Sequence, residues 1–231
     1  MNKVKTIDAN NPYTQMQQKA YKRGTSLHLE HNDNVDYWDI LLKDLKEKDR
    51  WKGKLALDFG CGKGRNVVNM LSLCDWKRVD GIDISPGNIN WCNRTLPLHS
   101  HWYINDGVTV AILKSNEYDF IMSTIVLQHI AVYDIRRSLL TDLLRVLKPG
   151  GLFCFQMGFG VHTKDRPCVE YDDNKYDAVV TNGECDVSIN DEMVLIEDLK
   201  NIGYTNIDTV VRPAVDNGPH TDWIYARCSK H

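Results

Sequence analysis

The stretch Leu55-Ala56-Leu57-Asp58-Phe59-Gly60-Cys61-Gly62-Lys63-Gly64-Arg65-Asn66 decides the fold, because an apolar run ends in an acid and gives way to glycines at alternate positions. A short apolar run before glycines is typical of a buried strand. Glycines let the backbone turn sharply and approach a ligand closely, and a helix that follows presents unpaired N–H groups there. The stretch therefore predicts a strand, a ligand-binding loop and a helix.

The glycine spacing separates this loop from two phosphate-binding loops. Dinucleotide loops follow G-x-G-x-x-G and triphosphate loops follow G-x-x-x-x-G-K-[ST], whereas this loop reads Gly60-x-Gly62-x-Gly64 after Asp58. A carboxylate beside the loop suits an ammonium or hydroxyl group better than a pyrophosphate. A second apolar run, 79–84, carries Asp83 nineteen positions after Gly64. This is near the spacing at which an acid meets ribose hydroxyls in a doubly wound sheet.

Three further motifs follow in order along the chain. They are Asn105-Asp106-Gly107, Tyr118-Asp119-Phe120-Ile121-Met122-Ser123 and Leu147-Lys148-Pro149-Gly150-Gly151. With the glycine loop and Asp83, this series resembles the ordered motifs of class I S-adenosylmethionine (SAM)-dependent methyltransferases. The resemblance spans residues from about 50 to the C-terminus. It implies S-adenosyl-L-methionine as the cofactor and S-adenosyl-L-homocysteine (SAH) as its product.

Strand-like runs alternate with helical periodicity, which favours a parallel sheet with helices on both faces. The expected strands are 54–58, 78–84, 101–104, 119–124, 152–157, 206–211 and 223–228. A helix is expected before Pro149, and another from Asp191 to Gly203. The predicted fold class is α/β: a doubly wound, Rossmann-like sheet of seven mostly parallel strands. The resemblance implies that a C-terminal antiparallel hairpin closes it.

The length of 231 residues predicts one methyltransferase domain. Its expected parts are an N-terminal cover segment (1–50), a cofactor-binding core (51–157), a substrate-region insert (158–190) and a C-terminal helix and hairpin (191–231). The cover segment is expected to contain one helix over 36–48. Connections longer than about 15 residues are usually functional. In the family such additions cover the cofactor and build the substrate pocket, so we expect specificity to lie there.

Composition limits the kinds of binding partner that we expect for this protein. A formal net charge of -3 and a pI near 6.2 give no general attraction to nucleic acid. The polar N-terminal stretch lacks the apolar core of a signal peptide, and no segment reaches membrane-spanning length. The seven cysteines are odd in number and contain no C-x-x-C spacing, which argues against a zinc or disulfide framework. We expect a cytoplasmic protein with a small-molecule substrate, no metal, and no nucleic-acid or membrane partner.

The resemblance assigns cofactor contacts to the ends of the first four strands. Gly60, Cys61 and Gly62 would line the amino-acid end of SAM, with Asp58 near it. Asp83 would accept hydrogen bonds from the ribose hydroxyls. The alternative for both acids is a solvated position at a strand end. The remaining expected cofactor contacts are Ile84, Asn105, Asp106, Gly107 and Thr124.

Ile84 would pack on the adenine, and Asp106 would accept from its exocyclic amine. Because Asn-Asp-Gly is also an ordinary turn sequence, Asp106 has a purely structural alternative. Thr124 ends the fourth strand, where the family's residues touch the methionine portion of the cofactor.

His129, in the stretch 123–130 after the fourth strand, is the candidate catalytic residue. An imidazole titrates near neutral pH and can take a proton from a hydroxyl or amine nucleophile. The alternative is that His129 hydrogen-bonds backbone and braces the loop. The candidates for lining the substrate pocket are Gln128, His162, Tyr171 and His220. For the insert residues the alternative is a plain polar lid.

The leading functional prediction is methyl transfer from SAM to an oxygen or nitrogen of a small molecule, such as a metabolite, sugar or natural-product intermediate. Methylation of protein or RNA is the first alternative. A non-catalytic protein that keeps the SAM pocket is the second, and a nicotinamide-dependent oxidoreductase is the third. Comparing NAD with SAM in a binding assay separates the last of these. The methyl acceptor, the use of a general base and the oligomeric state stay open.

Overall fold

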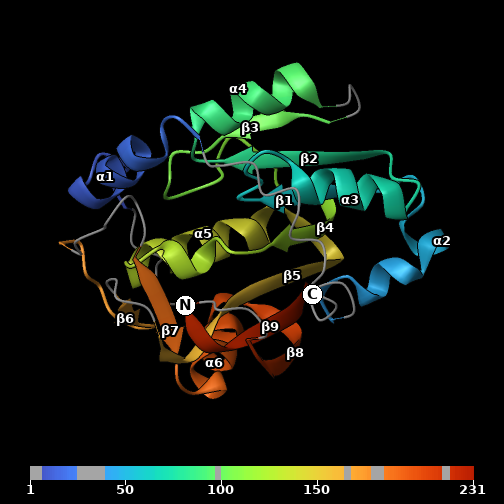
Figure 1. Ribbon diagram of the computed structural model, residues 1–231. Helices are drawn as coiled ribbons and strands as arrows, with labels where there is room; N and C mark the ends of the chain where they lie inside the picture. The colour runs from blue at the N-terminus through green and yellow to red at the C-terminus, as the bar shows by residue number, and fades with distance from the viewer. Residues whose placement is uncertain (1–6, 25–39, 97–99, 164–167, 178–184, 215–218) are drawn as a thin grey trace.

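One sheet of nine strands organises the described part of the chain, which comprises residues 7–24, 40–96, 100–163, 168–177, 185–214 and 219–231 of the computed structural model. Its strand order is β3-β2-β1-β4-β5-β7-β6; β9 also pairs with β5, and β8 pairs with β9 (Figure 1). The parallel strands are β1 (Leu55–Phe59), β2 (Arg78–Asp83), β3 (Trp102–Ile104), β4 (Tyr118–Ser123) and β5 (Leu147–His162).

The strand order reverses between β1 and β4, since β1 pairs with β2 on one side and with β4 on the other. In open α/β sheets, ligands bind beyond the carboxyl ends of the strands at such a point. The fold therefore places the glycine loop that follows β1 at the expected binding edge.

The C-terminal hairpin is present as predicted. β8 (Tyr204–Pro213) and β9 (His220–Lys230) are antiparallel, and β9 runs antiparallel along β5 from the pair Leu152–Ser229 to the pair His162–His220. The predicted class, a doubly wound and mostly parallel sheet with a closing hairpin, is confirmed. Both hairpin strands are longer than the sequence predicted.

The insert contributes two strands that the sequence analysis did not predict, β6 (Cys168–Glu170) and β7 (Asp186–Ile189). β7 pairs in parallel with β5 at Gly158 and Phe159, just past the last pair between β4 and β5. All four residues of β7 are buried, so its alternation of polar and apolar side chains does not expose a polar face. The insert thus extends the sheet beyond the carboxyl end of β4.

Helices cover both faces of the sheet, as predicted. The α-helices are α1 (Pro12–Tyr21), α2 (Lys48–Trp51), α3 (Arg65–Leu73), α4 (Pro86–Thr95), α5 (Tyr133–Val146) and α6 (Glu192–Ile202). One apolar cluster joins α5 and α6 to the sheet, and a second joins α2, α3 and α4 to it. None of the helices in the described residues combines the length and apolar character that crossing a membrane requires.

The expected cover helix over 36–48 is only partly described, because residues 25–39 lie outside the described ranges. Its described end is not a continuous α-helix. A 3-10 helix, η2 (Lys43–Lys46), is followed at Glu47 by a non-helical backbone (φ -80°, ψ 66°) before α2 begins. Leu41, Leu42 and Leu45 are nevertheless buried, as the predicted apolar face requires.

Candidate active site

The glycine loop after β1 adopts backbone conformations that favour glycine. Gly60, Gly62 and Gly64 have φ values of 75°, 52° and 80°. A Cβ atom on Gly60 would lie 2.1 Å from a methyl group of Val126, so the loop also approaches the segment after β4 closely. The backbone N–H groups of Gly60 and Cys61 both donate to the carbonyl of Ile82, at 2.8 and 3.1 Å. The loop is therefore tied to the end of β2.

Cys61 contributes its backbone to this loop. Its side chain is buried, and a Cβ atom added to Gly81 would lie 2.8 Å from its sulfur. The thiol is thus directed at β2, and burial raises its pKa well above the usual value. A ligand in the loop would meet the peptide groups around Cys61.

Asp58 ends β1 as a completely buried carboxyl group. Its Oδ1 is 3.5 Å from the amide nitrogen of Asn66, and its Oδ2 has no hydrogen-bond partner among the described residues. Burial raises the pKa of Asp58 to about 7, and the Asn66 contact and the positive charge of Arg65 oppose that shift. The solvated alternative is therefore excluded. A buried carboxylate oxygen without a partner is a place for a cationic or hydroxyl-bearing ligand.

Asn66 links Asp58 to Thr124. Its amide nitrogen also donates to the Thr124 hydroxyl at 3.0 Å, and Thr124 is 5% exposed. Because Asn66 lies on α3 and Thr124 directly follows β4, this contact joins the ends of β1 and β4. Sequence reasoning missed Asn66, although its place in the first turn after the glycine loop was a usable signal.

Asp83 is buried and anchors two loops. Its Oδ2 accepts from the Gly62 N–H at 2.8 Å, and its Oδ1 accepts from the Ser85 N–H at 2.8 Å and from the Asn88 amide at 3.3 Å. Burial raises the pKa of Asp83, and these three donors oppose that shift. A carboxylate has about four acceptor positions, so room for a ribose hydroxyl remains. The ribose contact stays a prediction, now alongside a structural role.

The loop after β3 contains the residues predicted to meet adenine. Asn105 is buried, and its Oδ1 has no hydrogen-bond partner among the described residues. The Asp106 carboxylate accepts from the N–H groups of Val108 and Thr109 and from the Thr109 hydroxyl, at 2.9, 2.6 and 2.8 Å. Asp106 therefore has the turn-forming role that the sequence left open. Its contact with adenine stays a prediction.

Ile84 and Gly107 lie together, as a shared adenine pocket requires. Gly107 has a φ of 88°, and a Cβ atom there would lie 2.9 Å from both the Ile84 Cδ1 and the Thr14 Cγ2. Thr14 belongs to α1, which therefore reaches the same loop.

α1 spans the loops that follow three strands. Gln18 donates to the carbonyl of Asp106, in the loop after β3, at 2.9 Å. The carbonyl of Tyr21 accepts from the hydroxyl of Ser85, in the loop after β2, at 2.5 Å. The Tyr13 hydroxyl accepts from the N–H group of Ala131, in the segment after β4, at 2.7 Å. α1 thus lies at the carboxyl edge of the sheet, whereas α2, from the end of the same cover segment, lies on the opposite side of the molecule in Figure 1.

Two of the predicted catalytic and substrate-lining residues meet at one carboxylate, and a third packs beside them. The Asp186 side chain on β7 is completely buried; His129 Nδ1 lies 3.3 Å from its Oδ1, and His162 Nε2 lies 2.8 Å from its Oδ2. The His220 ring packs edge-on against His162 at a centroid distance of 5.4 Å. Gln128, beside His129, is buried, and its Oε1 has no hydrogen-bond partner among the described residues.

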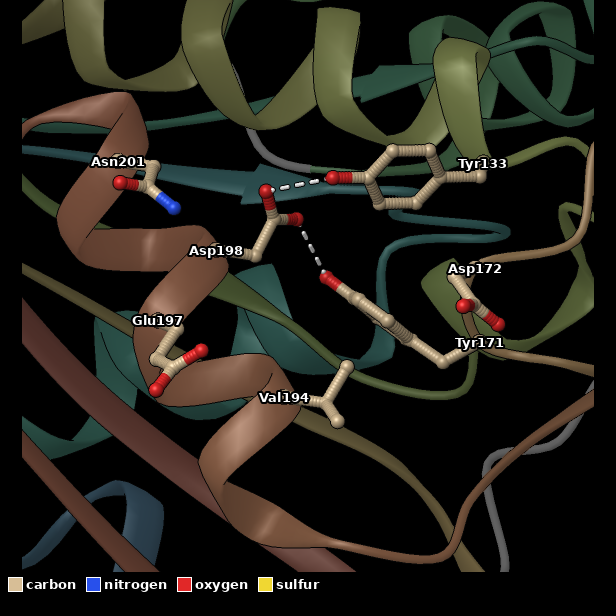
Figure 2. Close-up of a pocket in the computed structure, with 7 residues that line it drawn as sticks. All are labelled: Tyr133, Tyr171, Asp172, Val194, Glu197, Asp198 and Asn201. Atoms are coloured by element: carbon tan, nitrogen blue, oxygen red, sulfur yellow. Dashed lines mark hydrogen bonds between the residues drawn. The ribbon is translucent and has the colours of Figure 1, made fainter.

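Tyr171 is not brought to this group. Its hydroxyl donates to Asp198 on α6 at 2.9 Å, and Tyr133 donates to the other oxygen of Asp198 at 2.8 Å. Figure 2 shows both tyrosines directed at Asp198 in a pocket of about 170 Å³ between α6 and the start of α5. The Tyr171 carbonyl also accepts from the buried Arg136. Tyr171 therefore holds the insert against α5 and α6.

Like Asn66, Asp186 is a site residue that sequence reasoning missed. The alternation in Asp186–Ile189 is typical of a strand that carries polar side chains on one face, and this was a usable signal. Within the described ranges, no group of three or more His, Cys, Asp or Glu side chains has the arrangement of a metal site.

The comparisons with known proteins agree with this geometry. Residues 57–155 match the sequence model of a family described as "Methyltransferase domain". No curated protein matches the chain. A SAM-dependent methyltransferase of Methanosarcina mazei is structurally similar, with a TM-score of 0.59 and 17% identity over 78% of this chain and 93% of that chain.

Two further solved structures share the fold and have ligands named with them. The geranyl diphosphate C-methyltransferase of Streptomyces coelicolor A3(2), with Mg²⁺, geranyl diphosphate and SAH, has a TM-score of 0.63 and 11% identity over 97% of this chain and 100% of its own. Phosphoethanolamine N-methyltransferase 2 of Haemonchus contortus, with phosphomonomethylethanolamine and SAH, has a TM-score of 0.60 and 17% identity. That match covers 84% of this chain and 53% of the nematode protein.

The sheet reverses its strand order beside a glycine loop and is closed by an antiparallel hairpin. Together with the family match, these features define a methyltransferase of the Rossmann-like class. Residues 57–155 are thus a methyltransferase domain, and the chain has the fold of SAM-dependent methyltransferases.

Proposed function

We propose that this protein binds SAM along the carboxyl edge of the sheet and transfers its methyl group to an oxygen or nitrogen of a small molecule. The observation that carries the proposal is the unpartnered Oδ2 of Asp58, buried beside a glycine loop whose backbone is held by Asp83. The Asn105 Oδ1, also buried and without a partner in the described residues, offers a second contact at the other end of the same edge.

These residues fit the parts of SAM. The Asp58 carboxylate would pair with the ammonium group, while the peptide groups of Gly60–Gly62 would line the amino-acid end. Asp83 would accept from the ribose hydroxyls through its remaining acceptor positions. Ile84 and Gly107, which lie in contact range, would together form one wall of the adenine site, with the Asn105 oxygen available to its amine.

The chemistry of the proposed reaction makes modest demands on the protein. A methyl group on a sulfonium is electrophilic, and that is the chemistry SAM supplies. The chain must hold the acceptor atom in line with the methyl group and exclude water, and orientation of this kind can contribute several kcal/mol and up to about 7–11 kcal/mol in favourable cases. His129 would take the proton from an acceptor that starts as a hydroxyl or ammonium group.

A small acceptor is favoured over protein or RNA by two observations. The overall charge is -3, which gives no general attraction to a polyanion. The acceptor side of the edge is built from polar groups, namely the buried Gln128, Asp186 and His220 and the part-buried His162. In two structural neighbours the acceptors named are small molecules.

Thermal denaturation with ligands tests the cofactor. A ligand at one hundred times its Kd stabilises a folded protein by about 2.7 kcal/mol. We expect SAM and SAH to raise the melting temperature and NAD to leave it unchanged, with Asp83→Ala losing most of the SAM effect. An NAD-specific shift, or no SAM binding by calorimetry, would contradict the proposal.

A panel of primary amines, phenols and sugars, with labelled SAM as donor, tests the acceptor. We expect label in a small product from at least one class. Labelling confined to protein or RNA of a cell extract would favour the macromolecular alternative. Binding of SAM without turnover in either assay would favour a non-catalytic protein.

A further inference from the structure

The buried carboxylate of Asp186 lies between two histidines from different elements. His129 comes from η3 (Leu127–His129), after β4, and His162 ends β5. The Asp186 oxygens lie 3.3 Å from Nδ1 of His129 and 2.8 Å from Nε2 of His162. Burying a carboxylate completely is costly unless charged or hydrogen-bonding partners compensate. The two imidazoles supply such partners.

The topology brings Asp186 to the reacting edge. β7 continues the sheet where β4 ends, since Ser123 of β4 pairs with Phe155 and β7 pairs with the next part of β5, at Gly158 and Phe159. η3, which directly follows that end of β4, packs against β7. A strand of the insert therefore carries its acid to the edge that also carries the glycine loop.

A purely bracing role for the His129 side chain is not needed. The His129 backbone carbonyl already accepts from the Tyr13 hydroxyl and from Gln17, each at 3.3 Å. These bonds from α1 hold the loop through its main chain. The imidazole itself is 16% exposed, so one edge of the ring can be reached by a ligand.

We propose that Asp186 is the positioning residue for His129. Its carboxylate accepts a hydrogen bond from the Nδ1–H group of the imidazole, which leaves Nε2 as the atom that takes a proton from the methyl acceptor. This inference rests on the proposed function and deepens it, because it assigns the acceptor to the hydroxyl and ammonium classes. Neither a carboxylate acceptor nor a thioether acceptor has a proton to give.

The electrons and protons of the step balance. The acceptor oxygen or nitrogen forms a bond to the methyl carbon, the carbon–sulfur bond breaks with its electron pair left on sulfur, and the acceptor proton passes to Nε2 of His129. The imidazolium that results lies beside the Asp186 carboxylate, which stabilises the positive charge until the proton leaves to solvent. In the present structure Nδ1 and the carboxylate are within ion-pair range without hydrogen-bond alignment, and such contacts often tighten when ligands bind.

Several titratable groups face this pair. Besides His162 on β5, Asp186 is close enough to Cys168 on β6 to raise the pKa of that thiol, after the larger effect of burial. His220 on β9 packs against His162, and the Tyr13 hydroxyl on α1 reaches the His129 carbonyl. A test must therefore report on His129 itself.

Nitrogen-15 NMR of the imidazoles provides that report, because long-range couplings identify which ring nitrogen carries the proton. In the wild-type protein with SAH, we expect His129, assigned with His129→Gln, to be protonated at Nδ1 and bare at Nε2. Asp186→Asn should abolish this preference. Ser188→Ala is the matched control: Ser188 lies two residues along β7 and its hydroxyl donates to the Gly160 carbonyl at 2.5 Å, away from the His129 ring, so the tautomer should not change.

Kinetics with a responding amine, phenol or sugar from the panel give the second readout. Asp186→Asn should lower kcat about 10²-fold or more, the range of general-base contributions, and leave the SAM Kd within about twofold. Ser188→Ala should keep kcat within about threefold. A merely structural role would instead lower stability equally in both variants and affect kcat and SAM binding together.

The wild-type spectrum decides the inference even where Asp186→Asn does not fold. His129 protonated at Nε2 and bare at Nδ1 overturns it, as does an unchanged kcat in folded Asp186→Asn. These failures are distinct from failure of the proposed function, which would appear as absent SAM binding in the wild-type protein.

Discussion

At the scale of single residues, Asp58 has opposite consequences for stability and for binding. Its folded pKa of about 7 lies above the usual 3.8, so the native state holds this proton more tightly than the unfolded chain. Stability attributable to Asp58 is therefore full below about pH 4, falls as the pH rises through this window, and is lost above about pH 7. At neutral pH, burial of the ionised Asp58 lowers the free energy of unfolding by on the order of a few kcal/mol.

Asp58→Asn removes the ionisable group, so the free protein should melt at a higher temperature at pH 8 and show little gain at pH 4. The same variant should bind SAM at least tenfold more weakly, because the ammonium group loses its counter-charge. Melting curves at pH 4, 6 and 8 and calorimetry at pH 8 measure the two effects. A variant that is less stable at pH 8 would contradict the assigned burial cost.

Ile125 presents a second residue-scale conflict. It directly follows Thr124 with a φ of 56°, a conformation that is costly for a β-branched side chain, and its side chain is 47% exposed. Strain of this kind is concentrated at functional sites. Ile125 stands where the cofactor and the acceptor are proposed to meet.

Ile125→Gly should therefore stabilise the protein by up to about 1 kcal/mol, since relief of strain outweighs the added freedom of the unfolded chain. Asn116→Gly is the control, because Asn116 has a φ of 54° and asparagine tolerates that conformation. Urea unfolding of both variants measures the difference. Equal changes in the two would show that Ile125 is not strained.

At the scale of elements, α1 illustrates what the sequence could and could not predict. Asn11 followed by Pro12 is a helix-start pattern, and the Asn11 side chain does cap the Thr14 N–H. The sequence analysis places this helix in the cover segment, and a covering role over the cofactor stays a prediction. Its contacts with three separate loops depend on tertiary structure. No local pattern specifies that Tyr13 reaches Ala131 across the chain.

Tyr13→Phe should reveal that coupling. The change leaves the buried N–H of Ala131 without its acceptor, which costs about 1–3 kcal/mol. We expect lower stability and faster amide hydrogen exchange at Ala131. Gln15→Ala, at an exposed position of the same helix, is the control and should leave both unchanged. If Ala131 exchanges at the wild-type rate in Tyr13→Phe, the bond does not hold the loop.

The parallel core was predictable because its strands are short apolar runs, a pattern that burial on both faces selects, and because β1 and β2 carry acids at or near their carboxyl ends. β6 and β7 were not, because three- and four-residue strands gain their identity from the strand they pair with rather than from their own periodicity. For the same reason the partner of His129 was hidden, since Asp186 lies fifty-seven positions away in the sequence.

At the scale of the whole molecule, the cofactor edge and the acceptor edge differ in how they are encoded. The candidate cofactor residues Asp58, Asp83 and the glycines lie in short contiguous motifs, which carry the family resemblance; their contacts with the cofactor stay predictions. The acceptor edge is assembled from β5, β7, β9 and η3, whose polar residues are scattered. Tyr171 illustrates this scatter, because it was expected to line the substrate pocket, and its hydroxyl donates to Asp198 on α6, away from the histidines around Asp186.

The long pairing of β5 with β9 has a consequence for how the protein is made. Until residues 220–230 leave the ribosome, the edge of β5 that β9 covers along Leu152–His162 stays open, with its apolar side chains and its unpaired peptide groups. A nascent chain that has completed every cofactor motif is thus still a template for unwanted strand pairing. Released chains that stop at Pro219 should therefore recruit chaperones or aggregate, and released chains that extend through Lys230 should not.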